Sequence, residues 1–150
     1  MAQTLVKNYL HIIFSTKNRK PLILPSIEME LYSYLGGVFG NLECFPQRVG
    51  GHLDHVHIAC QLSKKIPLMS LLGELKSSSS SWIKSKGFEY ENFYWQTGYG
   101  AFSISPSELD RVIAYIENQH LHHQKTSFQD EYRALFKKYK VEYDERYIWD

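Results

Sequence analysis

The segment Gly51-His52-Leu53-Asp54-His55-Val56-His57-Ile58-Ala59-Cys60 decides the fold. Side chains alternate across a strand, so His55 and His57 lie on one face while Val56, Ile58 and Cys60 lie on the other. The apolar face predicts a strand that packs on a core, in a sheet covered on one side only. Two imidazoles on one face suit a single divalent metal ion, because imidazole is a common ligand and is neutral above its ordinary pKa of roughly 6.5.

Strands and one helix are predicted on the N-terminal side and around this segment. Residues 4–14 are rich in β-branched and aromatic side chains and predict a strand that ends at the basic turn of residues 16–21. A helix is expected to begin with Ser26 as its N-cap. Residues 43–50 and 55–62 predict a hairpin whose turn lies at Gly50-Gly51 or extends through Leu53-Asp54.

A strand and three helices are predicted on the C-terminal side. Pro67 opens a helix whose apolar spacing continues to Gly87 through five serines at residues 77–81, although by composition these serines also resemble a linker. Residues 93–104 predict an aromatic strand in which Gly98 and Gly100 allow a bulge or the close approach of another backbone. Residues 105–108 match a capping box at a helix start, and a last helix is expected from Thr126 or Ser127.

The predicted order of elements is β-α-β-β-α-β-α-α. Its first six elements match a ferredoxin-like split, an α+β fold with two helices on one face of an antiparallel sheet, to which two C-terminal helices are added. The length of 150 residues is that of one domain, which we expect to span residues 1–150. The strand that begins at His55 then lies near the sheet centre, and its histidines face the side that the first two helices leave free.

Charge is distributed unevenly although the net charge is only +1. No acidic residue precedes Glu28, but Lys17, Arg19 and Lys20 do, and a second basic stretch surrounds Lys76. A uniformly basic surface is therefore excluded, and a polyanion is expected to touch selected loops. Lys17, Arg19, Lys20 and Lys76 are candidate phosphate contacts, with a solvated charged loop as the alternative.

Two cysteines and the absence of a long apolar run limit the cellular context. Cys44 and Cys60 lack metal-binding spacing and are expected to be reduced residues in or near the core. The N-terminus has no signal-peptide pattern, and no apolar run approaches the ~20 residues of a membrane span. We therefore expect a cytoplasmic protein without membrane contact.

The helix after the capping box presents a phenol and an amide on one edge. Tyr115 and Gln119 lie four residues apart on the flank of an apolar stripe formed by Leu109, Val112, Ile113 and Ile116. Taken alone this pair is weak evidence for a site, because a tyrosine beside an apolar stripe usually packs with its hydroxyl at the surface.

Together these segments resemble the HUH-type single-tyrosine transposases, which include REP-associated tyrosine transposases and insertion-sequence-200-like enzymes. The resemblance is carried by His55-Val56-His57 and, downstream, by the helical Tyr115-Ile116-Glu117-Asn118-Gln119. Further matching pieces follow in order at residues 11–19, 54–57, 75–78 and 95–99.

The resemblance implies cleavage and rejoining of single-stranded DNA near a hairpin, without a nucleotide cofactor. Tyr115 would be the nucleophile that forms a 5′-phosphotyrosine and frees a 3′-hydroxyl. His55, His57 and Gln119 would hold Mg²⁺ or Mn²⁺. It also implies a homodimer joined edge to edge, in which Tyr115 reaches the histidines of its own chain or of the partner.

Two other functions stay open at this stage. A domesticated nickase acting on chromosomal repeats would share the chemistry, whereas a single-strand nucleic-acid-binding module on a ferredoxin-like sheet would need no metal. Trp95, Tyr99 and Phe102 are candidates for base stacking or for core packing.

Further histidines and one aspartate lie close to these candidates in sequence. His120, His122 and His123 look like a metal cluster, but near a helix end we expect them to interact with the helix dipole or with solvent. His52 and Asp54 either orient the metal ligands or only shape the hairpin turn.

Overall fold

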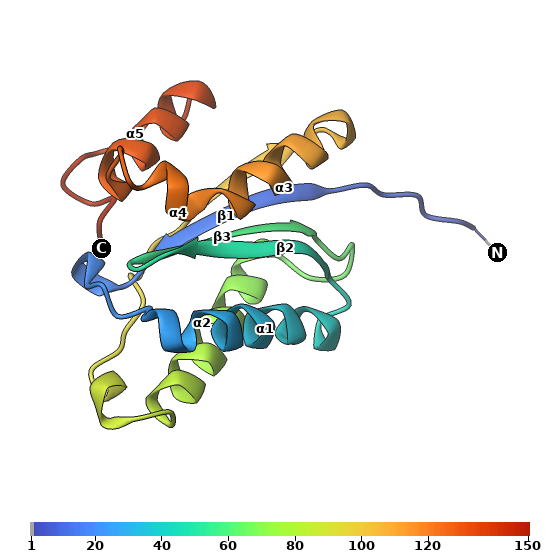
Figure 1. The fold of residues 1–150 in the computed structure, drawn as a ribbon. Helices are drawn as coiled ribbons and strands as arrows, with labels where there is room; N and C mark the ends of the chain where they lie inside the picture. Colours follow the sequence, from blue (N-terminus) through green and yellow to red (C-terminus); the bar gives the residue numbers. More distant parts are fainter. Residues whose placement is uncertain (1) are drawn as a thin grey trace.

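Four antiparallel strands form one sheet in the order β2-β3-β1-β4 (Figure 1). The computed structural model describes residues 2–150. The strands are β1 (Tyr9–Ser15), β2 (Phe45–His52), β3 (His55–Gln61) and β4 (Gly100–Ile104). Because β3 pairs with both β2 and β1, its histidines lie in the interior of the sheet. The predicted α+β fold with a ferredoxin-like order of elements is confirmed.

Helices α1 (Pro25–Asn41) and α2 (Leu68–Lys84) cover one face of the sheet (Figure 1). Their apolar stripes pack on Val56, Ile58 and Cys60, the β3 side chains that point away from the histidines. Both cysteines are free and buried in this core, as predicted. No helix within residues 2–150 combines the length and the hydropathy that crossing a bilayer requires.

The serine run of residues 77–81 is helical and belongs to α2. The hydroxyls of Ser78 and Ser79 donate to backbone carbonyls one turn earlier, which satisfies them inside the helix. Ser79 is buried and also accepts a hydrogen bond from the indole N–H of Trp95 at 2.9 Å. The helical spacing of the flanking apolar residues therefore outweighs the poor helix propensity of serine.

Three helices cover the opposite, histidine-bearing face: α3 (Leu109–Glu117), α4 (Gln119–His122) and α5 (Phe128–Lys138) (Figure 1). We predicted from the sequence that this face is free, but the C-terminal helices cover it. They pack there because the face also carries apolar residues. Ile13 and Phe102 pack on Phe128, Tyr132 and Phe136 of α5. Ala59 and Ile104 pack on Ile116 of α3.

Two glycines let the C-terminal helices lie close to the sheet. A Cβ at Gly50 would meet Cγ2 and the backbone oxygen of Ile116 at 2.8 Å each. A Cβ at Gly100 would meet the Tyr132 ring at 2.8 Å. Gly50 therefore fixes the approach of α3 to β2, and Gly100 fixes the approach of α5 to β4. The close approach predicted at Gly100 is made by a side chain rather than by a backbone.

Several predicted element boundaries were wrong. β1 begins at Tyr9 rather than at residue 4. Within residues 93–104 only Gly100–Ile104 forms a strand, and Trp95 makes an isolated bridge to Thr16. The hairpin turn lies at Leu53-Asp54, the second of the two predicted positions. Short 3₁₀ turns occupy Lys17–Arg19, Phe88–Tyr90 and Pro106–Glu108.

The predicted helix starts had mixed outcomes. α1 begins at Pro25 with Leu24 as its N-cap, because proline suits the first helical position, so Ser26 does not cap it. Ser105 makes no capping bond to the backbone, and its hydroxyl contacts Ser107 instead. Ser127 does cap α5, since its hydroxyl accepts from the backbone N–H of Asp130 at 3.1 Å.

Candidate active site

His55 and His57 stand side by side on β3 beneath the C-terminal helices. Both side chains are fully buried, and their ring centroids lie 5.0 Å apart. His55 Nδ1 lies 2.7 Å from the Asp54 carboxylate. His57 Nδ1 lies 2.8 Å from Nε2 of His11. These contacts fix both rings with their Nε2 atoms directed toward the covering helices. Asp54 thus has the orienting contact that the sequence allowed for it.

Tyr115 and Gln119 reach the two histidines from above, although the helix they share by sequence is interrupted. Asn118, with ψ 16°, separates α3 from α4. Gln119 Oε1 still lies 3.1 Å from His55 Nε2. The Tyr115 ring lies 5.7 Å from the His57 ring, centroid to centroid. The structure therefore brings all four residues named by the resemblance together within one chain.

Glu131 of α5 is the central residue of the site, and sequence reasoning missed it. Glu131 is buried, with 3% of its surface exposed. One oxygen, Oε1, lies 3.0 Å from His57 Nε2 and 3.2 Å from His55 Nε2. The other, Oε2, accepts hydrogen bonds from the Tyr115 hydroxyl and from the Gln119 amide. The sequence did carry one signal for it. Glu131 lies on the apolar stripe of the last predicted helix, and a charged side chain in such a position is buried only with a partner.

His123 also joins the site, so its expected exposure to solvent was wrong. The chain after α4 turns His123 inward, and its Nε2 lies 3.1 Å from Glu131 Oε1 and 2.9 Å from Gln119 Oε1. Single donor atoms of His55, His57, His123 and Glu131 all lie within 4.8 Å of one another. His120, by contrast, is half exposed and contacts Glu28 and His52 at the surface.

Burial and hydrogen bonding shift the pKa values of the site in different directions. Burial lowers the pKa of His57 to about 4. Burial also lowers the pKa of His55, but its bonds to Asp54 and Glu131 outweigh this effect and raise it to about 9. The surrounding histidines outweigh burial at Glu131 and lower its pKa. Burial and the neighbouring Glu131 raise the pKa of Tyr115, so the phenol holds its proton and donates it to the carboxylate.

The family is decided by a comparison with known families. The model of the family described as "Transposase IS200 like" matches residues 4–119, which include His55, His57, Tyr115 and Gln119. The chain belongs to the IS200-like transposases. The match ends before His123 and Glu131.

Two solved structures share the fold of this transposase. One is a candidate transposase of Deinococcus radiodurans R1, with 19% identity over 79% of this chain and 96% of the other, at a TM-score of 0.61. The second is a REP-associated tyrosine transposase bound to a REP hairpin, with 16% identity over 82% of this chain and 73% of the other, also at a TM-score of 0.61. No curated protein sequence matches the chain.

The predicted basic contacts of the transposase lie in two different settings. Lys17 and Lys20 are exposed in the turn that follows Ser15, the last residue of β1 and the one paired with His55. Arg19 packs over the Trp149 ring at 5.3 Å. Lys76 Nζ lies within 2.9 Å of three backbone carbonyls, those of residues 96, 97 and 98. These carbonyls use the three hydrogens of the ammonium group, so a phosphate would have to replace one of them. DNA contact by any of these residues stays a prediction.

The aromatic residues named as stacking candidates also divide between core and surface. Trp95 and Phe102 are buried, which is the packing alternative, whereas Tyr99 is 37% exposed.

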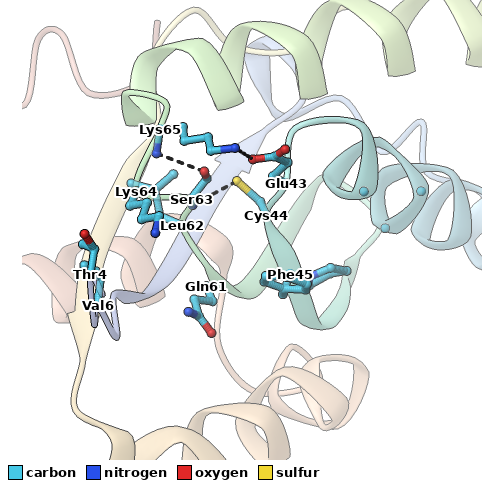
Figure 2. A pocket seen from close by; sticks show the side chains of 14 residues that line it. Thr4, Val6, Glu43, Cys44, Phe45, Gln61, Leu62, Ser63, Lys64 and Lys65 are labelled. Atoms are coloured by element: carbon cyan, nitrogen blue, oxygen red, sulfur yellow. Dashed lines mark hydrogen bonds and ion pairs between the residues drawn. The ribbon is translucent and has the colours of Figure 1, made fainter. Parts of the chain in front are cut away.

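A separate cavity of about 830 Å³ lies at the other end of β3 from His55 (Figure 2). The N-terminal segment, the end of α1 and the start of β2 line it. Lys65 and Glu43 form an ion pair at its rim, and Cys44 accepts a hydrogen bond from the backbone N–H of Ser63. None of its lining residues is a histidine, and the group of side chains that could hold a metal ion lies at the buried histidines instead.

Proposed function

We propose that this transposase cleaves single-stranded DNA next to a hairpin and rejoins it through a covalent bond to Tyr115. One observation carries the proposal. The Tyr115 hydroxyl shares a single buried carboxylate with His55 and His57. A tyrosine hydroxyl on a buried acid beside two ordered imidazoles suits a nucleophile held next to a metal site.

In the proposed reaction the Tyr115 oxygen attacks a DNA phosphorus atom. A bond forms between that oxygen and phosphorus, and the bond from phosphorus to the 3′-oxygen breaks. The phenol proton leaves to the buried polar network, and the released 3′-oxygen takes up a proton to become a hydroxyl. Attack by a second 3′-hydroxyl on the phosphotyrosine reverses these steps and joins two strands, so neither water nor a nucleotide is consumed.

The donor atoms around His55 fit a divalent metal ion. His55, His57 and Gln119 would hold it, since imidazole nitrogens and an amide oxygen are suitable ligands and Gln119 Oε1 lies beside His55 Nε2. When bound, Mg²⁺ or Mn²⁺ supplies positive charge that stabilises a phosphate oxygen as negative charge develops there. Asp54 would keep the His55 ring in position.

We further propose that each active site is built from one chain. The contact of Tyr115 with Glu131 lies within the same polypeptide, which supports cleavage in cis. A homodimer joined at a sheet edge stays a prediction; the edge strands are β2 and β4. Binding of a DNA hairpin is proposed from the solved relative that is bound to one.

The test is formation of a covalent protein–DNA adduct on a labelled hairpin oligonucleotide with Mn²⁺. The wild-type chain should give a band that survives denaturation, and Tyr115→Phe should give none while still binding the hairpin. Tyr147→Phe is the matched control, because that tyrosine is 63% exposed and should leave the adduct unchanged. An undiminished adduct from Tyr115→Phe would refute the assignment. Hairpin binding without any wild-type adduct would instead support a binding module.

A further inference from the structure

Glu131 divides its two carboxylate oxygens between two tasks. Oε1 lies 3.2, 3.0 and 3.1 Å from the Nε2 atoms of His55, His57 and His123. Oε2 accepts from the Tyr115 hydroxyl and the Gln119 amide. Three imidazoles therefore converge on one side of the carboxylate, and the nucleophile lies on the other side.

We propose that His123 and Glu131 are additional metal ligands, and that the completed site selects a first-row transition metal ion over Mg²⁺. This inference rests on the proposed function and specifies the metal of that same site. Mg²⁺ prefers oxygen ligands and retains water, whereas imidazole nitrogen suits Zn²⁺ and other first-row transition ions, among which Mn²⁺ binds most weakly. Two imidazoles and one amide leave the choice of metal open. Three imidazoles and a carboxylate favour a transition metal ion over Mg²⁺.

The surroundings of Glu131 support a cation at this position. Glu131 is 3% exposed, and burying a charged carboxylate requires compensating charge or hydrogen bonds nearby. Among the described residues its ion-pair partners are all histidines, namely His55, His57, His122 and His123. A divalent ion bound among these imidazoles would balance the charge of the buried carboxylate.

The same carboxylate would connect the metal to the nucleophile. Because Oε2 holds the Tyr115 hydroxyl, the ligand that faces the ion also sets the position of the phenol. Glu131 and His123 lie outside the residues that match the family model, so this feature comes from the C-terminal part of this chain.

The experiment measures metal binding to the full chain without DNA. After chelator treatment, Mn²⁺ and Mg²⁺ are titrated by calorimetry, and Co²⁺ is followed by its visible absorption. The wild type should bind Mn²⁺ at least about tenfold more tightly than Mg²⁺. His123→Ala and Glu131→Gln should each weaken Mn²⁺ binding by at least about tenfold, since even residues behind the ligands contribute that much.

Two neighbouring residues of the same type serve as controls: Asp130 for Glu131 and His120 for His123. Asp130→Asn removes an exposed carboxylate on α5, and His120→Ala removes a half-exposed imidazole on α4. Both should leave Mn²⁺ affinity unchanged. If a site variant does not fold, the His123 ring ¹⁵N signals of the wild type are recorded with and without Zn²⁺. A shift of these signals on addition of Zn²⁺ shows that His123 binds the metal ion.

Three results would overturn the inference. They are equal affinity for Mg²⁺ and Mn²⁺, unchanged Mn²⁺ affinity in folded His123→Ala and Glu131→Gln, or no ¹⁵N shift at His123. Adduct formation with Mg²⁺ in that case would leave the proposed function standing. Normal Mn²⁺ binding without any adduct would instead refute the proposed function and keep the metal site.

Discussion

Substitution of Gly50 by alanine should displace the nucleophile without changing any polar group. The new Cβ would lie 2.8 Å from Cγ2 and from the backbone oxygen of Ile116, whereas ordinary contact begins at 3.4 Å. The helix must therefore move by about 0.6 Å, because a backbone oxygen cannot rotate away as a side chain does. Ile116 directly follows Tyr115, so the phenol moves with it relative to His57, the residue paired with Gly50.

The expected loss of stability follows from overpacking. Inserting a methyl group into a packed interface costs about 1–3 kcal/mol. In a domain of this length each kcal/mol lowers Tm by about 2–4 °C, so Gly50→Ala should melt about 2–12 °C below the wild type. A misplacement of about 1 Å can cost roughly 10²-fold in rate, so a shift of about 0.6 Å should slow adduct formation by about tenfold or more.

Thermal unfolding and the initial rate of adduct formation on a hairpin oligonucleotide are the two measurements. Gly73→Ala is the control: this glycine lies within α2 and has open space around its Cβ position. That variant should gain about 0.5–1 kcal/mol, because alanine favours a helix over glycine. If Gly50→Ala melts no lower than the wild type and forms the adduct at the same rate, the close approach of α3 does not position Tyr115.

Two further changes test how α5 and a loop are held. Ser127→Ala removes the N-cap of α5 and should lower the free energy of unfolding by about 1 kcal/mol, which lowers Tm by about 2–4 °C. Ser105→Ala is the control and should change Tm by less, because Ser105 caps no backbone group. Equal effects of the two substitutions would contradict the capping assignment. Lys76→Met removes three hydrogen bonds to the carbonyls of residues 96–98 and should lower the free energy of unfolding by about 1.5–3 kcal/mol in urea titrations. Unchanged stability with weaker DNA binding would show that Lys76 serves mainly as a phosphate contact.

The core of the sheet was predictable because strand alternation is local. Val56, Ile58 and Cys60 alternate with His55 and His57, and this period of two places the two sets on opposite faces whatever the rest of the chain does. Helical spacing likewise predicted the serine-rich part of α2, and α5 begins next to Ser127, one of the two start residues expected for the last helix. The placing of Tyr115 and Gln119 on one edge follows from their separation of four residues.

The completed site was decided by tertiary structure. His123 contacts His55, which lies 68 positions earlier in the chain. Glu131 contacts His57, which lies 74 positions earlier. No local pattern encodes such a contact, because it depends on how close α5 packs against β4 and on the space left at Gly100. The sequence alone determined which side chains share a face. Packing of the C-terminal helices decided which of them meet, because that depends on the sum of distant apolar contacts.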